Sequence, residues 1–156
     1  MGRFMDAARA WGLPVGPHGG RCNAPHSRLV GSSCLLFLLC AVHGATHRDP
    51  TSCVFALLTT VLSFASDFAC NVPRSPLSAL LRARIRAVDR AVSTTYALWL
   101  TRLAVFQFGL QLLAALLPLV AMLSYSRASP TRAVWIVRHS LWHLFAVVEC
   151  LVVMEC

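Results

Sequence analysis

Long stretches without any Asp, Glu, Lys or Arg are the feature that most constrains this chain. Residues 29–47, 50–66 and 103–126 carry no such side chain, and most of their residues are apolar. Apolar runs of about 18 or more residues are typical of helices that cross a lipid bilayer. Only 13% of the chain is charged, whereas soluble domains are about one quarter charged. This composition argues against an ordinary soluble enzyme, and it is too hydrophobic for a disordered protein.

These runs predict an all-α fold, a multi-pass bundle of transmembrane helices. A Gly/Pro-rich leader at residues 1–28 has no apolar periodicity and is predicted to be disordered. The transmembrane domain is expected to cover residues 29–154. Its expected spans are residues 29–46, 51–72, 88–106, 109–126 and 133–154. The chain is therefore expected to be an integral membrane protein, with an endomembrane or the plasma membrane favoured.

The first span allows more than one interpretation. An Arg-bearing leader, the apolar core CLLFLLCAV and the small-residue exit HGAT are also typical of a signal peptide cleaved near Ala45. The leader of about 28 residues is long for a signal peptide, so a membrane anchor is favoured. Because the leader is poor in acidic residues, a transit peptide is a further alternative. If the first span is removed, four spans remain with the same orientation.

The positive charge predicts the topology of the spans. The chain has 14 cationic residues, all of them Arg, against 6 acidic residues, and its formal charge is +8. Such a balance first suggests nucleic-acid binding. The arginines instead gather in the connections 73–90 and 127–138, and cytoplasmic loops are enriched in basic residues. Both connections and the N-terminus are therefore predicted to be cytoplasmic, with the C-terminus outside. The basic connection 73–90 has no interleaved aromatics, and the sequence has no Gly-rich phosphate loop and no zinc-finger spacing. No nucleic-acid partner is therefore expected.

Two cytoplasmic connections on either side of residues 91–126 require an even number of crossings between them. Two short helices fit this requirement, and the polar cluster Gln107, Gly109 and Gln111 is the best place for their outer turn. One long helix with Arg102 buried in the membrane is the alternative. It conflicts with the placement of the arginines and leaves a charge inside the bilayer.

Ionisable side chains within spans are costly and mark candidate functional sites. Under the predicted topology Asp67, Asp89, His139 and His143 all lie at the cytoplasmic face. The two histidines are four residues apart, so both imidazoles lie on one helix face and can chelate one metal ion. Asp67 is the expected third ligand of a zinc ion with an open fourth position. Asp89 and Ser63 are placed to support this site.

A structural interpretation of the same residues stays open. Histidines near Trp135 and Trp142 also suit the aromatic belt at a membrane interface. Asp67 and Asp89 could each pair with an arginine, and Ser63 could bond back to its own helix.

Two further features are expected to be structural. Glu149 in the last span and Arg102 in the third lie at similar predicted depth, which predicts an ion pair. The seven cysteines show no CxxC spacing. Most of them fall in or at the ends of apolar spans, where Cys behaves as a small hydrophobe, so no disulfide framework is predicted.

The arrangement of these motifs resembles the CREST superfamily, which includes alkaline ceramidases and progestin/adipoQ receptors. That family has S-x3-H late in its second helix, an Asp entering the third and H-x3-H early in the last. The matching segments here are Ser63-Phe-Ala-Ser-Asp67, Val88-Asp89-Arg90 and His139-Ser-Leu-Trp-His143. Asp67 stands where the family has histidine, and the family has seven spans rather than about five.

The resemblance implies a zinc-dependent hydrolase that attacks a lipid amide. It implies that His139, His143 and Asp67 hold the metal, while Asp89 and Ser63 act as catalytic residues. The partners would be the lipid bilayer and a lipid substrate.

A non-enzymatic membrane scaffold or subunit is the alternative function. In that case the polar residues only fix helix packing, and the partners are other membrane subunits. Small residues that permit close helix contact do recur, at Ala56, Ser63, Ala65, Ser66, Ala69, Ala114 and Ala115. A transporter or channel subunit is less favoured because the chain shows no inverted repeat.

Overall fold

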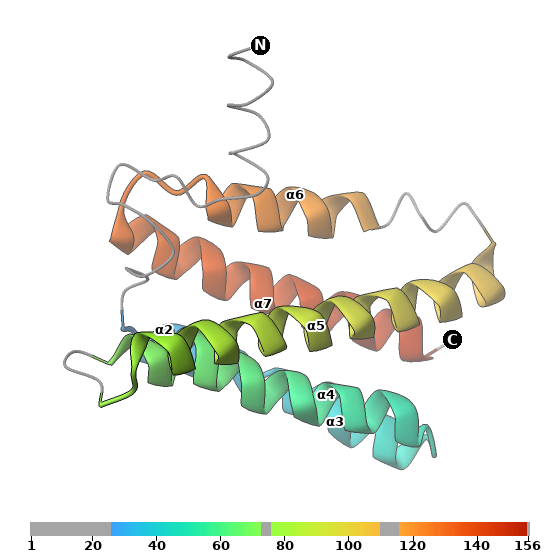
Figure 1. Cartoon of the computed structure of the whole chain (residues 1–156). Coiled ribbons are helices and arrows are strands. Elements are labelled where there is room, and N and C mark those ends of the chain that lie inside the picture. The colour runs from blue at the N-terminus through green and yellow to red at the C-terminus, as the bar shows by residue number, and fades with distance from the viewer. Residues whose placement is uncertain (1–25, 73–75, 110–115, 156) are drawn as a thin grey trace, which may run out of the picture.

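The computed structural model describes residues 26–72, 76–109 and 116–155 (Figure 1). Most residues in these ranges are helical and none belongs to a β-strand, which confirms the all-α prediction. Residues 1–25 of the predicted leader lie outside the described residues. The elements are α2 (Arg28–Cys34), α3 (Phe37–Thr46), α4 (Pro50–Ser63), the π-helical turn η1 (Phe64–Phe68), the 3-10 turn η2 (Ala69–Asn71), α5 (Ala79–Phe108), α6 (Leu116–Arg127) and α7 (Arg132–Glu155).

Three helical segments are long and apolar enough to cross a membrane. They are Arg28–Thr46, Pro50–Asn71 and Arg132–Glu155, with 19, 22 and 24 residues. At about 1.5 Å per residue they measure about 28, 33 and 36 Å, close to the hydrocarbon core of about 30 Å. They correspond to the first, second and last predicted spans and fit an integral membrane protein.

The helices run back and forth along one direction, and α7 lies among the others (Figure 1). It packs against α2, α3, α5 and α6, while α4 packs against α3 and α5. At one end of the bundle, here called the Asp67 end, lie the starts of α2, α5 and α7 and the end of α6. The turn between α3 and α4 and the end of α7 lie at the opposite end, here called the Glu155 end (Figure 1).

The third predicted span begins earlier in the structure than expected. α5 starts at Ala79 rather than near residue 88. Ser78 caps it, because its hydroxyl oxygen accepts a hydrogen bond from the Leu81 backbone N–H. Ala, Leu and Arg, which fill its first turns, are strong helix formers. Much of the connection expected at residues 73–90 is therefore helical.

α5 ends at Phe108, inside the polar cluster expected to form the outer turn. Gly109 follows with a φ of 70°, which glycine adopts without strain. α6 then runs back antiparallel to α5 (Figure 1), so residues 91–126 do not form one long helix. The expected turn residue Gln111 lies outside the described residues.

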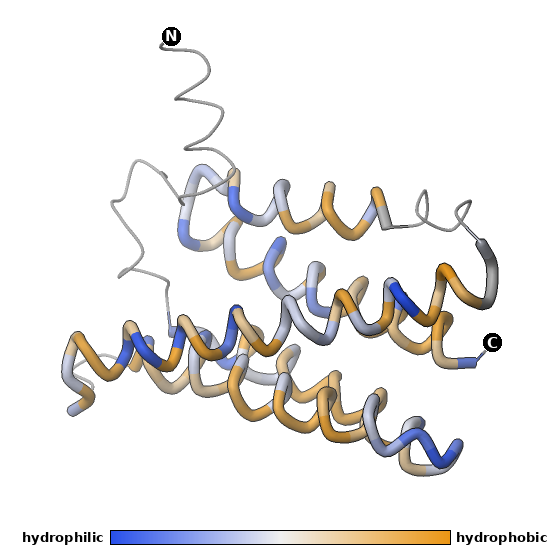
Figure 2. The backbone as a smooth tube through the Cα atoms, turned by 45° about the vertical axis from the view of Figure 1, so that its right-hand side comes forward, coloured by the Kyte–Doolittle hydropathy of each residue, from blue (hydrophilic) through white to orange (hydrophobic). Residues whose placement is uncertain are grey.

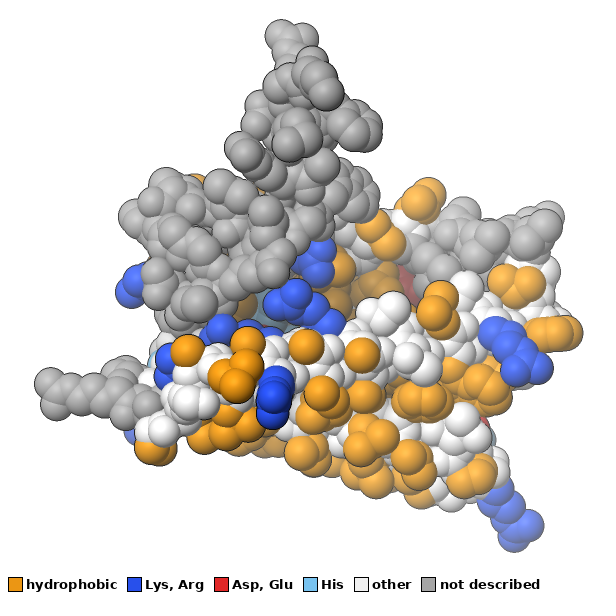
Figure 3. All heavy atoms as spheres, viewed as in Figure 1, with side chains coloured by type: hydrophobic (Ala, Val, Ile, Leu, Met, Phe, Trp, Pro, Cys, Tyr) orange, Lys and Arg blue, Asp and Glu red, His pale blue; other side chains and the backbone are white. Residues whose placement is uncertain are grey.

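The surface of the bundle is apolar in the middle and basic near its ends (Figures 2 and 3). Many leucine and valine side chains are exposed there, among them Leu39, Val42, Val61 and Leu98. Inside, the backbones of α3 and α4 approach closely at Gly44. A Cβ atom at Gly44 would lie 2.8 Å from the Cys53 backbone nitrogen. Both features suit helices packed within a bilayer.

Candidate functional site

Asp67 lies in the π-helical turn η1, directly after α4. Such turns often occur at functional sites. On an α-helix Ser63 and Asp67 would share one face. In the structure Ser63 contacts Asp89, whereas Asp67 contacts a histidine of α7. The turn is braced by Asn71, which donates to the Asp67 backbone carbonyl (2.8 Å) and accepts from Arg86 (2.8 Å).

The structure brings the three predicted metal ligands together. Asp67 Oδ2 lies 3.1 Å from His139 Nε2 and 3.7 Å from His143 Nε2. The His143 side chain is 0% exposed, and the other two are 14% and 20% exposed. In a tetrahedral zinc site with bonds of about 2.0–2.1 Å, neighbouring ligand atoms lie about 3.3 Å apart. Each separation is therefore compatible with a metal ion shared by Asp67 and that histidine, while the three residues whose ligand atoms all lie within 4.8 Å of one another are Cys34, Asp67 and His143.

The Ser33 hydroxyl lies between the Val30 carbonyl and the His143 ring. Ser33 Oγ donates to the Val30 carbonyl (2.8 Å), and the same oxygen lies 2.8 Å from His143 Nδ1. Both contacts are hydrogen bonds when the hydroxyl donates to the carbonyl and accepts from Nδ1–H, since a serine hydroxyl has one hydrogen. In that tautomer His143 Nε2 bears a lone pair on the side of Asp67. This buried nitrogen has no hydrogen-bond partner among the described residues.

Cys34 adds a thiol to the cluster. Three ligand atoms, one each from Cys34, Asp67 and His143, lie within 4.8 Å of one another. Cys34 is fully buried, and its sulfur lies 3.8 Å from His143 Nδ1. Imidazole, carboxylate and thiolate are the usual zinc ligands in proteins. The unpartnered nitrogen of His143 and this set of donors together fit a zinc ion.

His139 is held in place by α6 and by two tryptophans. Ser126 Oγ lies 3.1 Å from His139 Nδ1. The Trp135 and Trp142 rings stack on the imidazole, with centroid distances of 4.4 Å and 5.6 Å. These contacts orient the ring so that Nε2 points at Asp67, as metal-ligating histidines are commonly oriented.

The two predicted supporting residues lie beside this cluster. Ser63 Oγ donates to Asp89 Oδ1 at 2.8 Å, so Ser63 does not bond back to its own helix. Asp89 comes from α5, and its charge lies close enough to Asp67 to interact with it. All five residues expected at the site therefore gather at the Asp67 end of the bundle.

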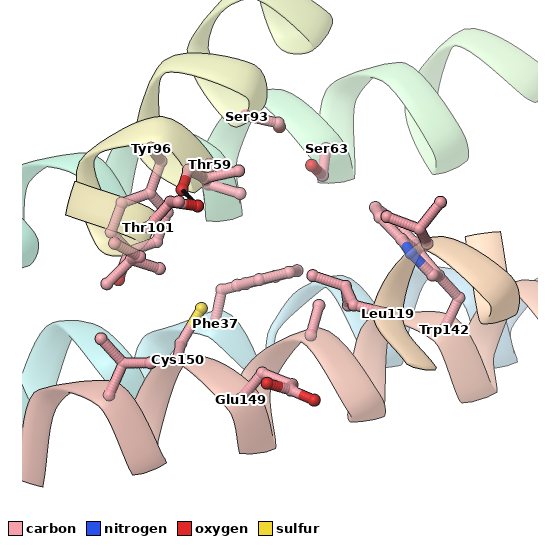
Figure 4. Close-up of a pocket in the computed structure, with 15 residues that line it drawn as sticks. Phe37, Thr59, Ser63, Ser93, Tyr96, Thr101, Leu119, Trp142, Glu149 and Cys150 are labelled. Atoms are coloured by element: carbon pink, nitrogen blue, oxygen red, sulfur yellow. Dashed lines mark hydrogen bonds between the residues drawn. The ribbon is translucent and has the colours of Figure 1, made fainter. Parts of the chain in front are cut away.

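An apolar cavity of about 210 Å³ adjoins the cluster (Figure 4). Ser63 and Trp142 line the side nearest the cluster, and Glu149 lies further along α7. The other lining residues include Phe37, Tyr96, Leu100, Leu119, Ala146 and Val153. A dry cavity of about 150 Å³ can hold benzene, so this one has room for a segment of alkyl chain.

The predicted ion pair between Arg102 and Glu149 is not formed within the described parts of the chain. Arg102 is exposed on α5, and its guanidinium carbon lies 5.6 Å from the ring centroids of both Trp99 and Phe106. Glu149 instead lines the apolar cavity. The two side chains therefore point in different directions although their helices are neighbours.

Ser33, Cys34 and Ser126 are site residues that the sequence did not identify. Serine and cysteine within an apolar run usually bond to their own helix or pack as small residues, so their presence carries no specific signal. Only the packing of α2 and α6 on α7 brings them to the histidines. No protein-family model, curated protein or solved structure matches this chain.

Proposed function

We propose that this chain is a five-span membrane protein whose cytoplasmic-side metal centre hydrolyses a lipid amide. One observation carries the proposal: the buried His143 Nε2, which has no hydrogen-bond partner among the described residues, lies 3.7 Å from Asp67 Oδ2. A buried ring nitrogen without a partner is unfavourable, and a divalent cation between it and the carboxylate would satisfy both groups. Zinc would be held by His139, His143 and Asp67.

The five-span topology is supported by the alternating direction of the helices and by the position of the arginines. Arg82, Arg84, Arg86 and Arg90 lie in the first turns of α5, and Arg127 and Arg132 flank the turn between α6 and α7. All of these arginines lie at the Asp67 end. Because cytoplasmic segments are enriched in basic residues, this end would face the cytoplasm.

Zinc held here would act as a Lewis acid and would lower the pKa of a water ligand to about 7. Ser63 donates to Asp89 Oδ1, and the Asp89 carboxylate would take a proton from the attacking water and pass it to the departing amine. A C–O bond forms and the amide C–N bond breaks. The products are a fatty acid and an amine.

The cavity supports a lipid as the substrate. Between Trp142 and Val153 it follows about 16 Å of α7, at about 1.5 Å per residue. An alkyl chain lying there would bring its polar end to Ser63, next to Asp89. The resemblance to the CREST superfamily points to the same chemistry, and a carboxylate in place of a family histidine is an ordinary zinc ligand.

A structural metal site is the second candidate, and Cys34 is the observation that favours it. Catalytic zinc sites keep one open position, whereas structural sites are closed by four protein ligands. If the Cys34 thiolate completes the set with Asp67, His139 and His143, no position is left for water. Cobalt substitution separates the two candidates, because a bound thiolate gives an intense sulfur-to-cobalt absorption band that Cys34→Ser would remove.

The metal is tested by measuring zinc in the detergent-purified full chain. We expect a His139→Ala/His143→Ala variant to contain one zinc ion fewer per chain than the parent. His26→Ala, which changes an exposed histidine outside the cluster, is the control and should keep the parent zinc content. An unchanged zinc content in the double variant would refute the metal site.

The reaction is tested with a long-chain N-acyl lipid in mixed micelles, with released fatty acid as the readout. We expect Asp89→Asn to reduce turnover by about 100-fold or more while the zinc stays bound, because general acid–base catalysis contributes about that much. Asp49→Asn is the matched control: Asp49 caps α4 at the Glu155 end, and asparagine caps equally well. Zinc binding without any release of fatty acid would support the structural site instead.

A further inference from the structure

A second group of metal-ligating side chains lies at the Glu155 end of the bundle. His43 lies in the last turn of α3, His47 follows as its C-cap, and Glu155 is the last residue of α7. One ligand atom from each of these three residues lies within 4.8 Å of the others. They are called the His43 cluster below. The hydrolytic mechanism proposed above makes no use of them.

The geometry of the His43 cluster suits chelation of one ion. His43 Nδ1 lies 3.5 Å from Glu155 Oε1, close to the separation of about 3.3 Å between ligands of tetrahedral zinc. The two imidazoles are four residues apart, and their rings stack with centroids 4.1 Å apart. Histidines with this spacing share one helix face. Glu155 supplies the carboxylate from a different helix.

A direct hydrogen bond does not explain this arrangement. No hydrogen bond joins His43 and Glu155 among the described contacts, and Glu155 is 62% exposed. The nearby Asp49 carboxylate already accepts from the Ser52 backbone N–H. The Glu155 carboxylate and the two imidazoles remain to face a cation.

We propose that His43, His47 and Glu155 bind a divalent transition metal of the zinc class at the Glu155 end. Imidazole and carboxylate are ligands that zinc accepts in three-residue sites. The ion would join the end of α3 to the end of α7. Because it binds only the folded bundle, it should stabilise the protein in proportion to its free concentration. This site does not depend on the hydrolase proposed above.

The test is a Zn²⁺ titration of the full chain in detergent, in the His139→Ala/His143→Ala background that removes the first site. We expect one zinc ion to bind per chain and to raise the melting temperature. His47→Ala and Glu155→Gln change exposed side chains, and each should weaken Zn²⁺ binding by at least about tenfold, or about 1.4 kcal/mol. His26→Ala in the same background is the control and should bind as the background does.

Absence of Zn²⁺ binding in that background, or unchanged binding after His47→Ala, would overturn the proposal. If the background variant fails to fold, the otherwise unchanged chain serves: His47→Ala should then lower its zinc content by one ion, and an unchanged content would refute the site. The two proposals fail separately, because loss of zinc on His139→Ala/His143→Ala reports the first site and loss on His47→Ala reports the second.

Discussion

The Ser33 hydroxyl contacts His143 from a helix more than 100 residues away in sequence. In the tautomer in which it donates to the Val30 carbonyl and accepts from Nδ1–H, Nε2 is free to bind a metal. Partners of this kind on the far nitrogen of a ligating histidine fix its tautomer and its orientation. Ser33 is thus a positioning residue for the proposed zinc site.

We predict that Ser33→Ala weakens zinc binding at this site by roughly 10- to 100-fold, the usual effect of losing such a partner. The zinc affinity is measured by competition with a chelator of known affinity, in a chain that also carries His47→Ala. Ser32→Ala is the matched control, since Ser32 is the exposed neighbour in the same helix. If the two variants bind zinc equally, the hydroxyl has no such role.

At the scale of elements, the first helical segment is part of the bundle core. Val30, Cys34, Phe37 and Cys40 are each at most 4% exposed, and α2 covers the His143 ring. A cleaved signal peptide makes no lasting contacts with the mature protein. The packing therefore favours the membrane anchor among the interpretations of residues 29–46.

We accordingly predict that residues 28–46 remain in the mature protein. The intact mass of a C-terminally tagged chain purified from membranes checks this. A mature chain that begins near Ala45 would contradict the prediction, because it would lack Ser33 and Cys34 and leave His143 without its partner.

At the scale of the whole molecule, the distribution of charge bears on how the bundle is oriented in the membrane. The arginines of the first turns of α5 and those around the turn between α6 and α7 lie at one end, and the exposed middle is apolar (Figure 3). The candidate hydrolytic site is at this same end. The His43 cluster is at the other.

We predict that the Asp67 end faces the cytoplasm. A flexible insert with an N-glycosylation site should be modified in microsomes when placed after Arg48, and should stay unmodified after Ser129. Inserts with the acceptor Asn changed to Gln are the controls for the mobility shift. Modification after Ser129 would reverse the orientation, and the arginine-based topology would then be wrong.

The sequence by itself determined the fold class and the polar residues that needed an explanation. Uninterrupted apolar runs of this length are typical of membrane-spanning helices, and the H-x3-H spacing places two imidazoles on one face of a helix. The helix break at Gly109 could also be expected from a local cluster of polar residues. The early start of α5 could not be expected from the sequence. Its Arg-rich first turns are compatible with a loop or a helix, and Ser78 cannot be recognised as a helix cap from the sequence alone.

Contacts between distant segments were decided only by the tertiary structure. Ser33, Cys34 and Ser126 reach the histidines because α2 and α6 pack on α7, and side chains of these types give no sign of such partners in advance. Arg102 and Glu149 point apart because the rotation of a helix about its axis depends on its neighbours, which a depth argument ignores. The π-helical turn at Asp67 likewise depends on the contacts around it. The sequence determines the spacing of residues along each helix, whereas the direction of each side chain depends on how the helices pack.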